Sequence, residues 1–193
     1  LDYNTGIDFM KYGFFAKAER KLFQDNLGLS FGFRVDEDSF SEGSSMMDNF
    51  SPRMALTYNL TEDQTWKINA SVGRYFKIPT YTMLGYQNSQ RRFVNKEAKY
   101  TRSDHLVAGL EYAPGNASRI TLEGFYKKYS QYPISLIDGV SLANKGGGFE
   151  VLGNEAISSD GKGKSYGVEA LYQQKLTKNF YGVFAYTYFH SQF

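Results

Sequence analysis

The sequence lacks the residues on which several classes of protein depend. It has no cysteine among its 193 residues, so neither a disulfide framework nor a thiolate metal site can form. The net charge is only +2 and the charges are dispersed, which gives no support to nucleic-acid binding. No run of about 18 apolar residues occurs, which excludes a transmembrane helix. The first twenty residues carry charges throughout and do not resemble a signal peptide.

Aromatic residues and glycine, by contrast, are abundant. Tyr and Phe occur 16 times each and Gly occurs 19 times, whereas there are only four Pro residues and one Trp. Aromatic side chains fit the pleated surface of a β-sheet, and glycine supplies the positive φ angle that tight turns require. The composition therefore favours strands that are joined by turns.

Apolar and polar residues alternate through most of the chain. In the segment 50–60, Met54, Leu56 and Tyr58 fall on one face of a strand, and Arg53 and Thr57 fall on the other. Segments of this kind predict eight strands, of which the first is the weakest candidate: 11–23, 27–35, 50–60, 66–72, 106–112, 119–132, 166–173 and 180–190. No segment has a convincing period of 3.6 residues, so we expect no long helix.

The connections between these strands are of two kinds, which alternate strictly along the chain. The short ones are turn-like and comprise residues 24–26, 61–64, 114–117 and 177–179. The long ones are mixed in composition and comprise residues 36–49, 77–103 and 133–164. This alternation predicts an all-β, up-and-down antiparallel meander, with every short turn at one end and every long loop at the other.

Strand length and loop asymmetry favour a transmembrane β-barrel. The predicted strands reach about 9–11 residues, which is the length that a tilted strand needs to cross a bilayer. Short periplasmic turns and long external loops are typical of outer-membrane barrels. Aromatic residues near the strand ends fit two interfacial girdles, namely Tyr58, Trp66, Tyr112 and Phe180 near the short turns and Tyr75, Phe76, Tyr126, Tyr129, Tyr166 and Tyr188 near the long loops. A soluble β-sandwich that binds a ligand or carbohydrate, or a smaller passive barrel, is the alternative.

The direction of the strands adds an expectation about completeness. If the short turns are periplasmic, both ends of this chain lie outside the cell. A complete bacterial barrel normally begins and ends in the periplasm, so we expect the chain to be an internal piece of a larger barrel.

Motifs for catalysis or metal binding fail at specific positions. Asp36-Glu37-Asp38 lacks the further acidic and Gly positions of a calcium loop, so we interpret it as a solvated acidic loop. His105 and His190 have no partner at ligand spacing. Paired carboxylates for glycoside hydrolysis could be sought among Glu111, Glu123 and Glu169, but a polar row facing the barrel lumen beside Lys67, Lys127 and Lys175 explains them better. We therefore expect no enzyme, catalytic residue, metal site or cofactor.

Five short motifs, in order, resemble a known family. Phe50-Ser51-Pro52-Arg53 enters a strand, and Gly73-Arg74-Tyr75-Phe76-Lys77-Ile78-Pro79 leaves one. The later motifs are Ser103-Asp104-His105 with Gly109-Leu110-Glu111-Tyr112, Ser165-Tyr166-Gly167-Val168-Glu169, and Tyr186-Thr187-Tyr188. This pattern is similar to the barrel of TonB-dependent outer-membrane receptors, and in particular it resembles receptors of the Bacteroidetes type. The similarity covers nearly the whole chain.

The resemblance implies an architecture and a function. Residues 1–193 would be a partial transmembrane barrel domain within a 22-stranded barrel, without the plug domain, the TonB box and the final strands. The receptor would sit in the outer membrane of a Gram-negative bacterium and take up a scarce nutrient actively, of the iron-siderophore, cobalamin, glycan or peptide class. Its partners would be its own plug domain, TonB acting through the plug, outer-membrane lipid and a small-molecule, metal-chelate or oligosaccharide ligand, with a surface lipoprotein as a further candidate and no nucleic acid.

The ligand contacts are expected in the second long loop. Tyr81, Tyr86, Arg91, Arg92 and Phe93 are the candidates, because aromatic rings offer large contact area and Arg pairs with anionic groups. The same loop begins at Pro79, which cannot donate to a strand ladder and so is expected to mark the end of the wall.

Overall fold

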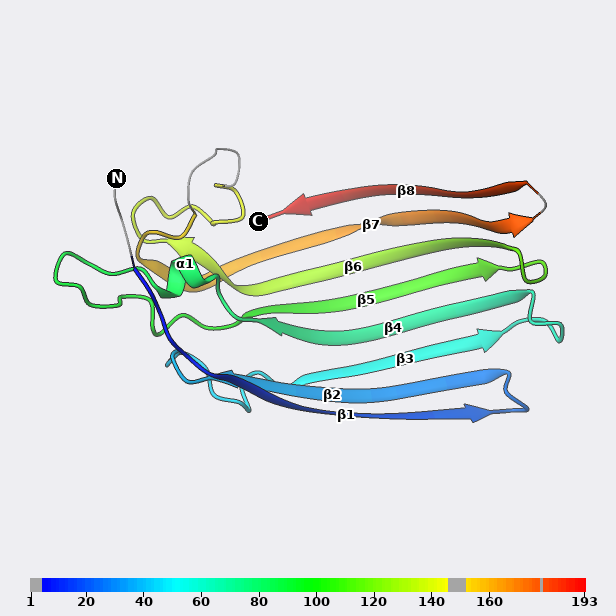
Figure 1. Cartoon of the computed structure of the whole chain (residues 1–193), viewed down its shortest axis with the longest axis horizontal. Helices are drawn as coiled ribbons and strands as arrows, with labels where there is room; N and C mark the ends of the chain where they lie inside the picture. The colour runs from blue at the N-terminus through cyan, green and yellow to red at the C-terminus, as the bar shows by residue number, and fades with distance from the viewer. Residues whose placement is uncertain (1–4, 146–151, 178) are drawn as a thin grey trace.

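The computed structural model describes residues 5–145, 152–177 and 179–193 as eight strands and one short helix. In chain order these elements are β1 (Lys11–Leu22), β2 (Leu27–Asp38), β3 (Ser51–Asn59), β4 (Trp66–Lys77), α1 (Tyr81–Leu84), β5 (Thr101–Tyr112), β6 (Ser118–Ser135), β7 (Ile157–Thr177) and β8 (Phe180–Gln192). All strands lie in one antiparallel sheet whose spatial order follows the sequence (Figure 1). The predicted up-and-down meander of eight strands is confirmed.

The strands extend further toward the long loops than the alternation predicted. β6 continues to Ser135 and β7 begins at Ile157, so both ends of the predicted loop 133–164 are strand. β5 likewise begins at Thr101. The alternation is weak there because small and polar residues, as in Ser158-Ser159-Asp160-Gly161, occupy both faces. The long connections are therefore 39–50, 78–100 and 136–156, which we name the first, second and third loops.

The strand register separates an apolar face from a polar face. Ile68 lies opposite Tyr58 on one side and Leu110 on the other, and Leu110 in turn lies opposite Leu122. These side chains project from the apolar face without cover, since Leu106 and Leu122 are each 55% exposed. A soluble protein would bury such a surface, whereas a membrane barrel presents it to lipid.

No second layer packs on the sheet within the described residues, where α1 is the one helix and lies in the second loop. A β-sandwich needs a second sheet about 10 Å from the first. The soluble β-sandwich alternative therefore does not fit this fold. In the part of the chain that the structure describes, no helix is long and apolar enough to cross a membrane.

The aromatic residues near the short turns lie where the girdle prediction places them. Tyr58, Trp66 and Tyr112 are on the apolar face, and the rings of Trp66 and Tyr112 are 4.4 Å apart. Phe180 follows the same parity as Phe184, which pairs with Tyr172 on this face. These residues form an aromatic belt on the apolar face at the short-turn end of the sheet.

The girdle prediction near the long loops is partly wrong. Phe76, Tyr126, Tyr166 and Tyr188 are on the apolar face, but Tyr75 and Tyr129 are on the polar face. Adjacent residues of a regular strand point to opposite faces, so Tyr75 and Phe76 cannot both meet lipid. The Tyr75 ring instead stacks beneath the Arg53 guanidinium at 4.4 Å and lies 4.6 Å from the His105 ring.

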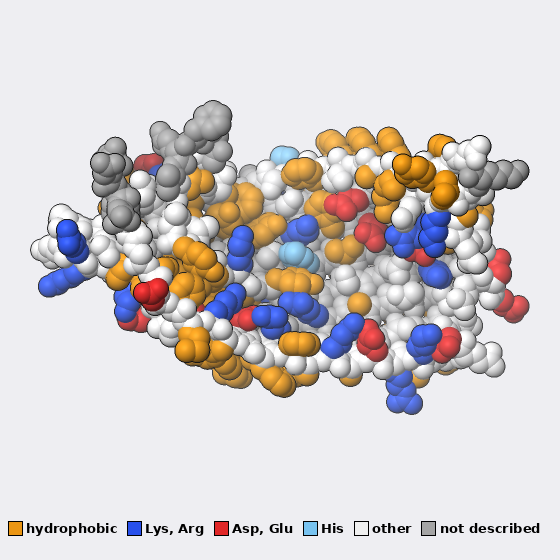
Figure 2. All heavy atoms as spheres, in the orientation of Figure 1, with side chains coloured by type: hydrophobic (Ala, Val, Ile, Leu, Met, Phe, Trp, Pro, Cys, Tyr) orange, Lys and Arg blue, Asp and Glu red, His pale blue; other side chains and the backbone are white. Residues whose placement is uncertain are grey.

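The polar face carries the predicted row of charged residues. Lys67 pairs with Glu111 at 3.8 Å, and Glu123 lies directly opposite Glu169. Thr57 donates a hydrogen bond to Asn69 at 2.9 Å on the neighbouring strand. Figure 2 shows charged side chains across the middle of this face and hydrophobic side chains along its upper and lower edges. The sheet is thus amphipathic, with a hydrophilic interior surface.

Candidate functional site

The loop end of the sheet contains most of the closely packed side chains. The fully buried residues of the described chain lie there, at strand ends or in the loops: Asn49, Ser51, Leu84, Tyr100 and Ser135. Met83 of α1 is also buried, and it lies against Gly153 of the third loop. The loops therefore pack against one another instead of extending separately into solvent, and we call this packed region the loop layer.

Asn95 joins the second loop to the third. This residue is 2% exposed, and its Nδ2 donates to the carbonyl oxygens of Met83 and Glu155, both at 2.8 Å. Its Oδ1 accepts a hydrogen bond from the Ile157 amide at 3.0 Å. A second link runs from the Thr82 hydroxyl to the Leu152 carbonyl at 2.9 Å. One buried amide side chain thus satisfies groups from two loops and the start of β7.

Tyr100 joins the second loop to the end of β2. Its hydroxyl donates to Asp38 Oδ2 at 2.7 Å, and its ring is 1% exposed. Burial, followed by the hydrogen bond and charge of Asp38, raises the pKa of the Tyr100 hydroxyl well above its ordinary value. The tyrosine therefore stays protonated and donating under physiological conditions.

The prediction that Asp36-Glu37-Asp38 is a solvated acidic loop is wrong. These residues end β2, and Asp36 and Asp38 are 7% and 4% exposed. Asp36 accepts two hydrogen bonds from Arg34, at 2.6 and 2.7 Å. Asp38 also accepts from the amides of Phe40 and Ser41, at 2.9 and 2.7 Å. The acidic residues are structural anchors for the first loop, and local sequence alone does not reveal their distant partner Tyr100.

An ion-pair network holds the third loop. Lys145 Nζ lies 2.9 Å from Asp138 and 3.0 Å from Glu155, and Glu155 also accepts a hydrogen bond from Ser135. The hydrogen bond from Lys145 lowers the pKa of the Asp138 carboxyl, and the same contact raises the pKa of Lys145. Asp138, Lys145 and Glu155 are therefore held together by charge at neutral pH.

An aromatic patch lies on the loop layer and includes two of the predicted contact residues. Phe9 lies 5.4 Å from the ring of Tyr81 and 6.4 Å from Phe40, and Phe40 lies 5.1 Å from Phe93. Lys96 Nζ is 5.6 Å from the centre of the Phe40 ring. A groove of about 570 Å³ runs beside Tyr81 and is lined by Thr5, Ile7, Phe9, Lys11, Tyr81, Thr82 and Gly85.

The other predicted residues lie nearby in the second loop but outside the aromatic patch. Arg91 and Arg92 are exposed in a turn that Asn88 closes, because Asn88 Oδ1 accepts from the Arg92 amide at 3.0 Å. Arg91 has a positive φ of 57°. Tyr86 is half-buried at the base of this segment, where its carbonyl accepts a hydrogen bond from Val94. Tyr81, Phe93 and the two arginines therefore share one loop without forming a single cluster.

Sequence reasoning missed Phe9, Phe40 and Lys96 as members of the patch. Phe9 precedes β1 and Phe40 follows β2, so neither is close to the second loop in the chain. The signal that points to them is topological, because alternating turns bring all long-loop segments to one end. Within residues 5–145, 152–177 and 179–193, no group of three or more His, Asp or Glu side chains could hold a metal ion.

An antiparallel wall with one apolar and one polar face, ordered loops at one end and short turns at the other, defines part of an outer-membrane β-barrel. The family model described as "TonB dependent receptor-like, beta-barrel" matches residues 1–193. The chain belongs to this family of TonB-dependent receptor barrels. No curated protein sequence matches the chain.

Solved structures share the fold at low sequence identity. The siderophore receptor PirA from Pseudomonas aeruginosa is 17% identical, with a TM-score of 0.68 over 95% of this chain and 32% of that one. The alcaligin receptor FauA from Bordetella pertussis is 14% identical, with a TM-score of 0.64 over 95% and 30%. A mutant of the ferric enterobactin receptor PfeA from Pseudomonas aeruginosa is 20% identical, with a TM-score of 0.66 over 94% and 26%. The chain spans about a third or less of these proteins.

Proposed function

We propose that this chain forms part of the wall and three external loops of an outer-membrane receptor that takes up a scarce nutrient by TonB-driven active transport. The family membership and the amphipathic wall support this proposal. In the proposed orientation the short turns are periplasmic and the loop layer faces outside a Gram-negative cell. The remainder of the receptor, with its plug domain, TonB box and the other strands of a 22-stranded barrel, would lie elsewhere in a longer protein.

The proposed ligand class is a ferric siderophore. Structures with this fold include a siderophore receptor, an alcaligin receptor and a ferric enterobactin receptor. The loop layer offers matching chemistry, since Tyr81 and Phe93 provide aromatic contact area and Arg91 and Arg92 provide cations for an anionic chelate. Cobalamin, glycan and peptide ligands are the competing classes for the same surface. The receptor acts as a transporter, and no catalytic residue is assigned.

The observation that carries the proposal is the ordered loop layer on a membrane-type wall. A preordered surface loses less conformational entropy when it captures a dilute ligand, so its affinity is higher than that of a mobile loop. The buried hydrogen bonds of Asn95 and Tyr100 order the loop layer. Tyr81, Arg91 and Arg92 remain exposed on its surface.

Equilibrium binding to the complete receptor in detergent tests the ligand class. Ferric catecholate and hydroxamate siderophores, cobalamin, an oligosaccharide mixture and a tryptic peptide mixture are titrated separately. We expect a ferric siderophore to bind at least tenfold more tightly than the other probes. Tightest binding of cobalamin, oligosaccharide or peptide would contradict the siderophore class and assign the ligand to that chemistry instead.

A further inference from the structure

Five basic residues cross the apolar face at its long-loop end. Arg74, Asp104, Lys128 and Lys164 are successive cross-strand partners on β4, β5, β6 and β7. Neighbouring strands are about 4.8 Å apart, so this row spans about 14 Å. Arg102 and Lys162 lie two residues further toward the loops, on β5 and β7. We name the five cations the basic row: Arg74, Arg102, Lys128, Lys162 and Lys164.

The charges of the basic row are only partly neutralised. Asp104 accepts hydrogen bonds from Arg74 at 2.7 Å and from Arg102 at 3.0 Å, so two guanidinium groups share one carboxylate. Within the described residues, the ammonium groups of Lys128, Lys162 and Lys164 have no ion pair or hydrogen bond. Asp160 is the other acid on this face of β5 to β7 at the loop end. The surface therefore keeps a net positive charge.

The position of the basic row corresponds to a membrane headgroup region. Leu106, Tyr126, Tyr166 and His190 are successive partners in the row immediately nearer the short turns. The two rows are two positions apart along each strand, which corresponds to a distance of about 7 Å. Tyr residues prefer the boundary between hydrocarbon and headgroups. The cations beyond them would therefore lie where the phosphates of a lipid leaflet lie.

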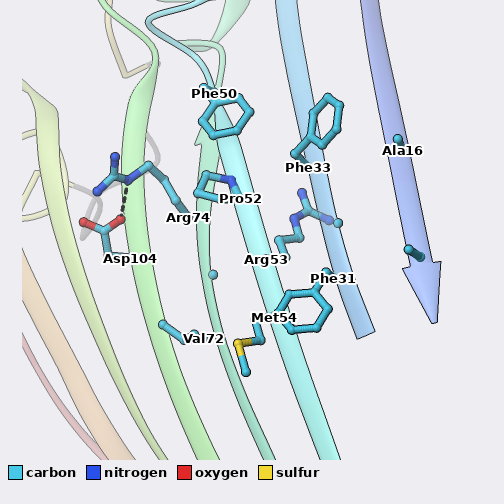
Figure 3. A pocket seen from close by; sticks show the side chains of 13 residues that line it. Ala16, Phe31, Phe33, Phe50, Pro52, Arg53, Met54, Val72, Arg74 and Asp104 are labelled. Atoms are coloured by element: carbon cyan, nitrogen blue, oxygen red, sulfur yellow. Dashed lines mark hydrogen bonds and ion pairs between the residues drawn. The ribbon is translucent and has the colours of Figure 1, made fainter. Parts of the chain in front are cut away.

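A groove in the apolar face begins at the same ion pair. It has a volume of about 710 Å³, and Arg53, Arg74 and Asp104 line it together with mostly apolar residues. Figure 3 shows Phe31, Phe33, Phe50, Pro52 and Met54 along β2 and β3, with Val72 and the Arg74–Asp104 pair on the side of β4 and β5. We name this feature the wall groove. It joins a largely apolar groove to a cationic end, which is the arrangement that an acyl chain with an anionic headgroup requires.

We infer that the basic row binds the phosphate groups of an anionic lipid in the outer leaflet, with an acyl chain of that lipid in the wall groove. This inference rests on the outer-membrane location in the proposed function. Charge complementarity selects a phosphate-bearing lipid, because unpaired lysines beside a hydrocarbon surface favour anionic headgroups. The bound lipid would seal the wall beside the ordered loops.

Lipid binding to the complete receptor tests the inference directly. The probes are diphosphorylated lipid A, the same lipid after enzymatic dephosphorylation, its deacylated headgroup and inorganic phosphate, each titrated in neutral detergent and read by native mass spectrometry. We expect diphosphorylated lipid A to bind at least tenfold more tightly than each other probe. The triple variant Lys128→Gln, Lys162→Gln, Lys164→Gln should bind diphosphorylated lipid A about 100-fold more weakly, since each lysine raises the affinity for an anionic lipid surface roughly fivefold.

A matched variant separates this site from general electrostatics. Lys17→Gln, Lys127→Gln and Lys175→Gln remove the same charge from the polar face and should leave lipid binding unchanged. Heat-modifiable migration on gels verifies that both variants fold. Equal binding of the dephosphorylated lipid, equal loss in both variants, or binding of inorganic phosphate as tight as that of the lipid would overturn the inference. Siderophore binding is read separately, so failure of the ligand class and failure of the lipid site are distinguishable.

Discussion

Asn95 Nδ2 donates to the Glu155 carbonyl at 2.8 Å, although 60 residues separate the two in the chain. This hydrogen bond, together with those to Met83 and Ile157, connects the second loop to the third and to the start of β7. One buried side chain therefore links two loops of the loop layer to the wall. The consequences of that arrangement can be measured.

Replacing Asn95 should loosen the loop layer without unfolding the wall. Asn95→Ala leaves two carbonyls and one amide without their partner, which costs about 2 kcal/mol or more locally. Amide exchange in residues 78–100 should therefore accelerate by about 30-fold or more, while exchange in the centre of β5 and β6 stays constant. Asn88→Ala is the control, because Asn88 closes only its own turn. Equal acceleration in both variants would refute the connecting role of Asn95.

Alkaline pH should open the contact between the second loop and β2. Burial raises the folded-state pKa of Tyr100, so its stabilising effect is complete below the ordinary tyrosine pKa and is lost as pH rises through the folded value. Protection factors in the second loop, which are corrected for the base-catalysed rise in intrinsic amide exchange, should therefore fall above about pH 10. Tyr100→Phe removes the donor to Asp38, so the protection factors of this variant should already be lower at neutral pH and should not fall further through this step. Loop protection factors that show the same pH dependence in both proteins would contradict this role.

The two faces of β6 should respond oppositely to a new charge. Leu122→Lys puts a cation on the apolar face near the middle of the strand, which costs about 2–4 kcal/mol in a bilayer. Thr121→Lys puts the same cation on the polar face and should cost little. The check is urea titration of the complete receptor folded into lipid vesicles. A comparable decrease in the free energy of unfolding for the two substitutions would show that the faces are assigned incorrectly.

The arginines of the second loop should contribute to binding of an anionic chelate. Arg91 has a left-handed backbone, so Arg91→Gly removes the guanidinium without backbone strain. Combined with Arg92→Ala, it should weaken binding of the cognate ferric siderophore about tenfold, with unchanged loop exchange. Lys21→Ala, at the short-turn end, is the control. Equal affinity in both variants would remove these arginines from the site.

The fold was predictable from sequence because period-two alternation and loop lengths are local signals. The strands and the meander followed from them, as did the polar row of Lys67 and Glu111. Tyr75 was misplaced because composition near a strand end does not distinguish its two faces, whereas register does. Asp38, Asn95 and Phe9 could not be assigned because their partners are distant in the chain and only the folded sheet brings them together.

Uptake of ⁵⁵Fe-labelled siderophore by cells that produce the complete receptor tests the proposed function most directly. The siderophore is the one bound most tightly in the equilibrium titrations, and the host lacks its own receptors. We predict saturable uptake in cells with functional TonB and its loss, with cell-surface binding retained, in the same cells without TonB. Uptake at the same rate in both strains would show passive passage and would contradict a TonB-driven receptor.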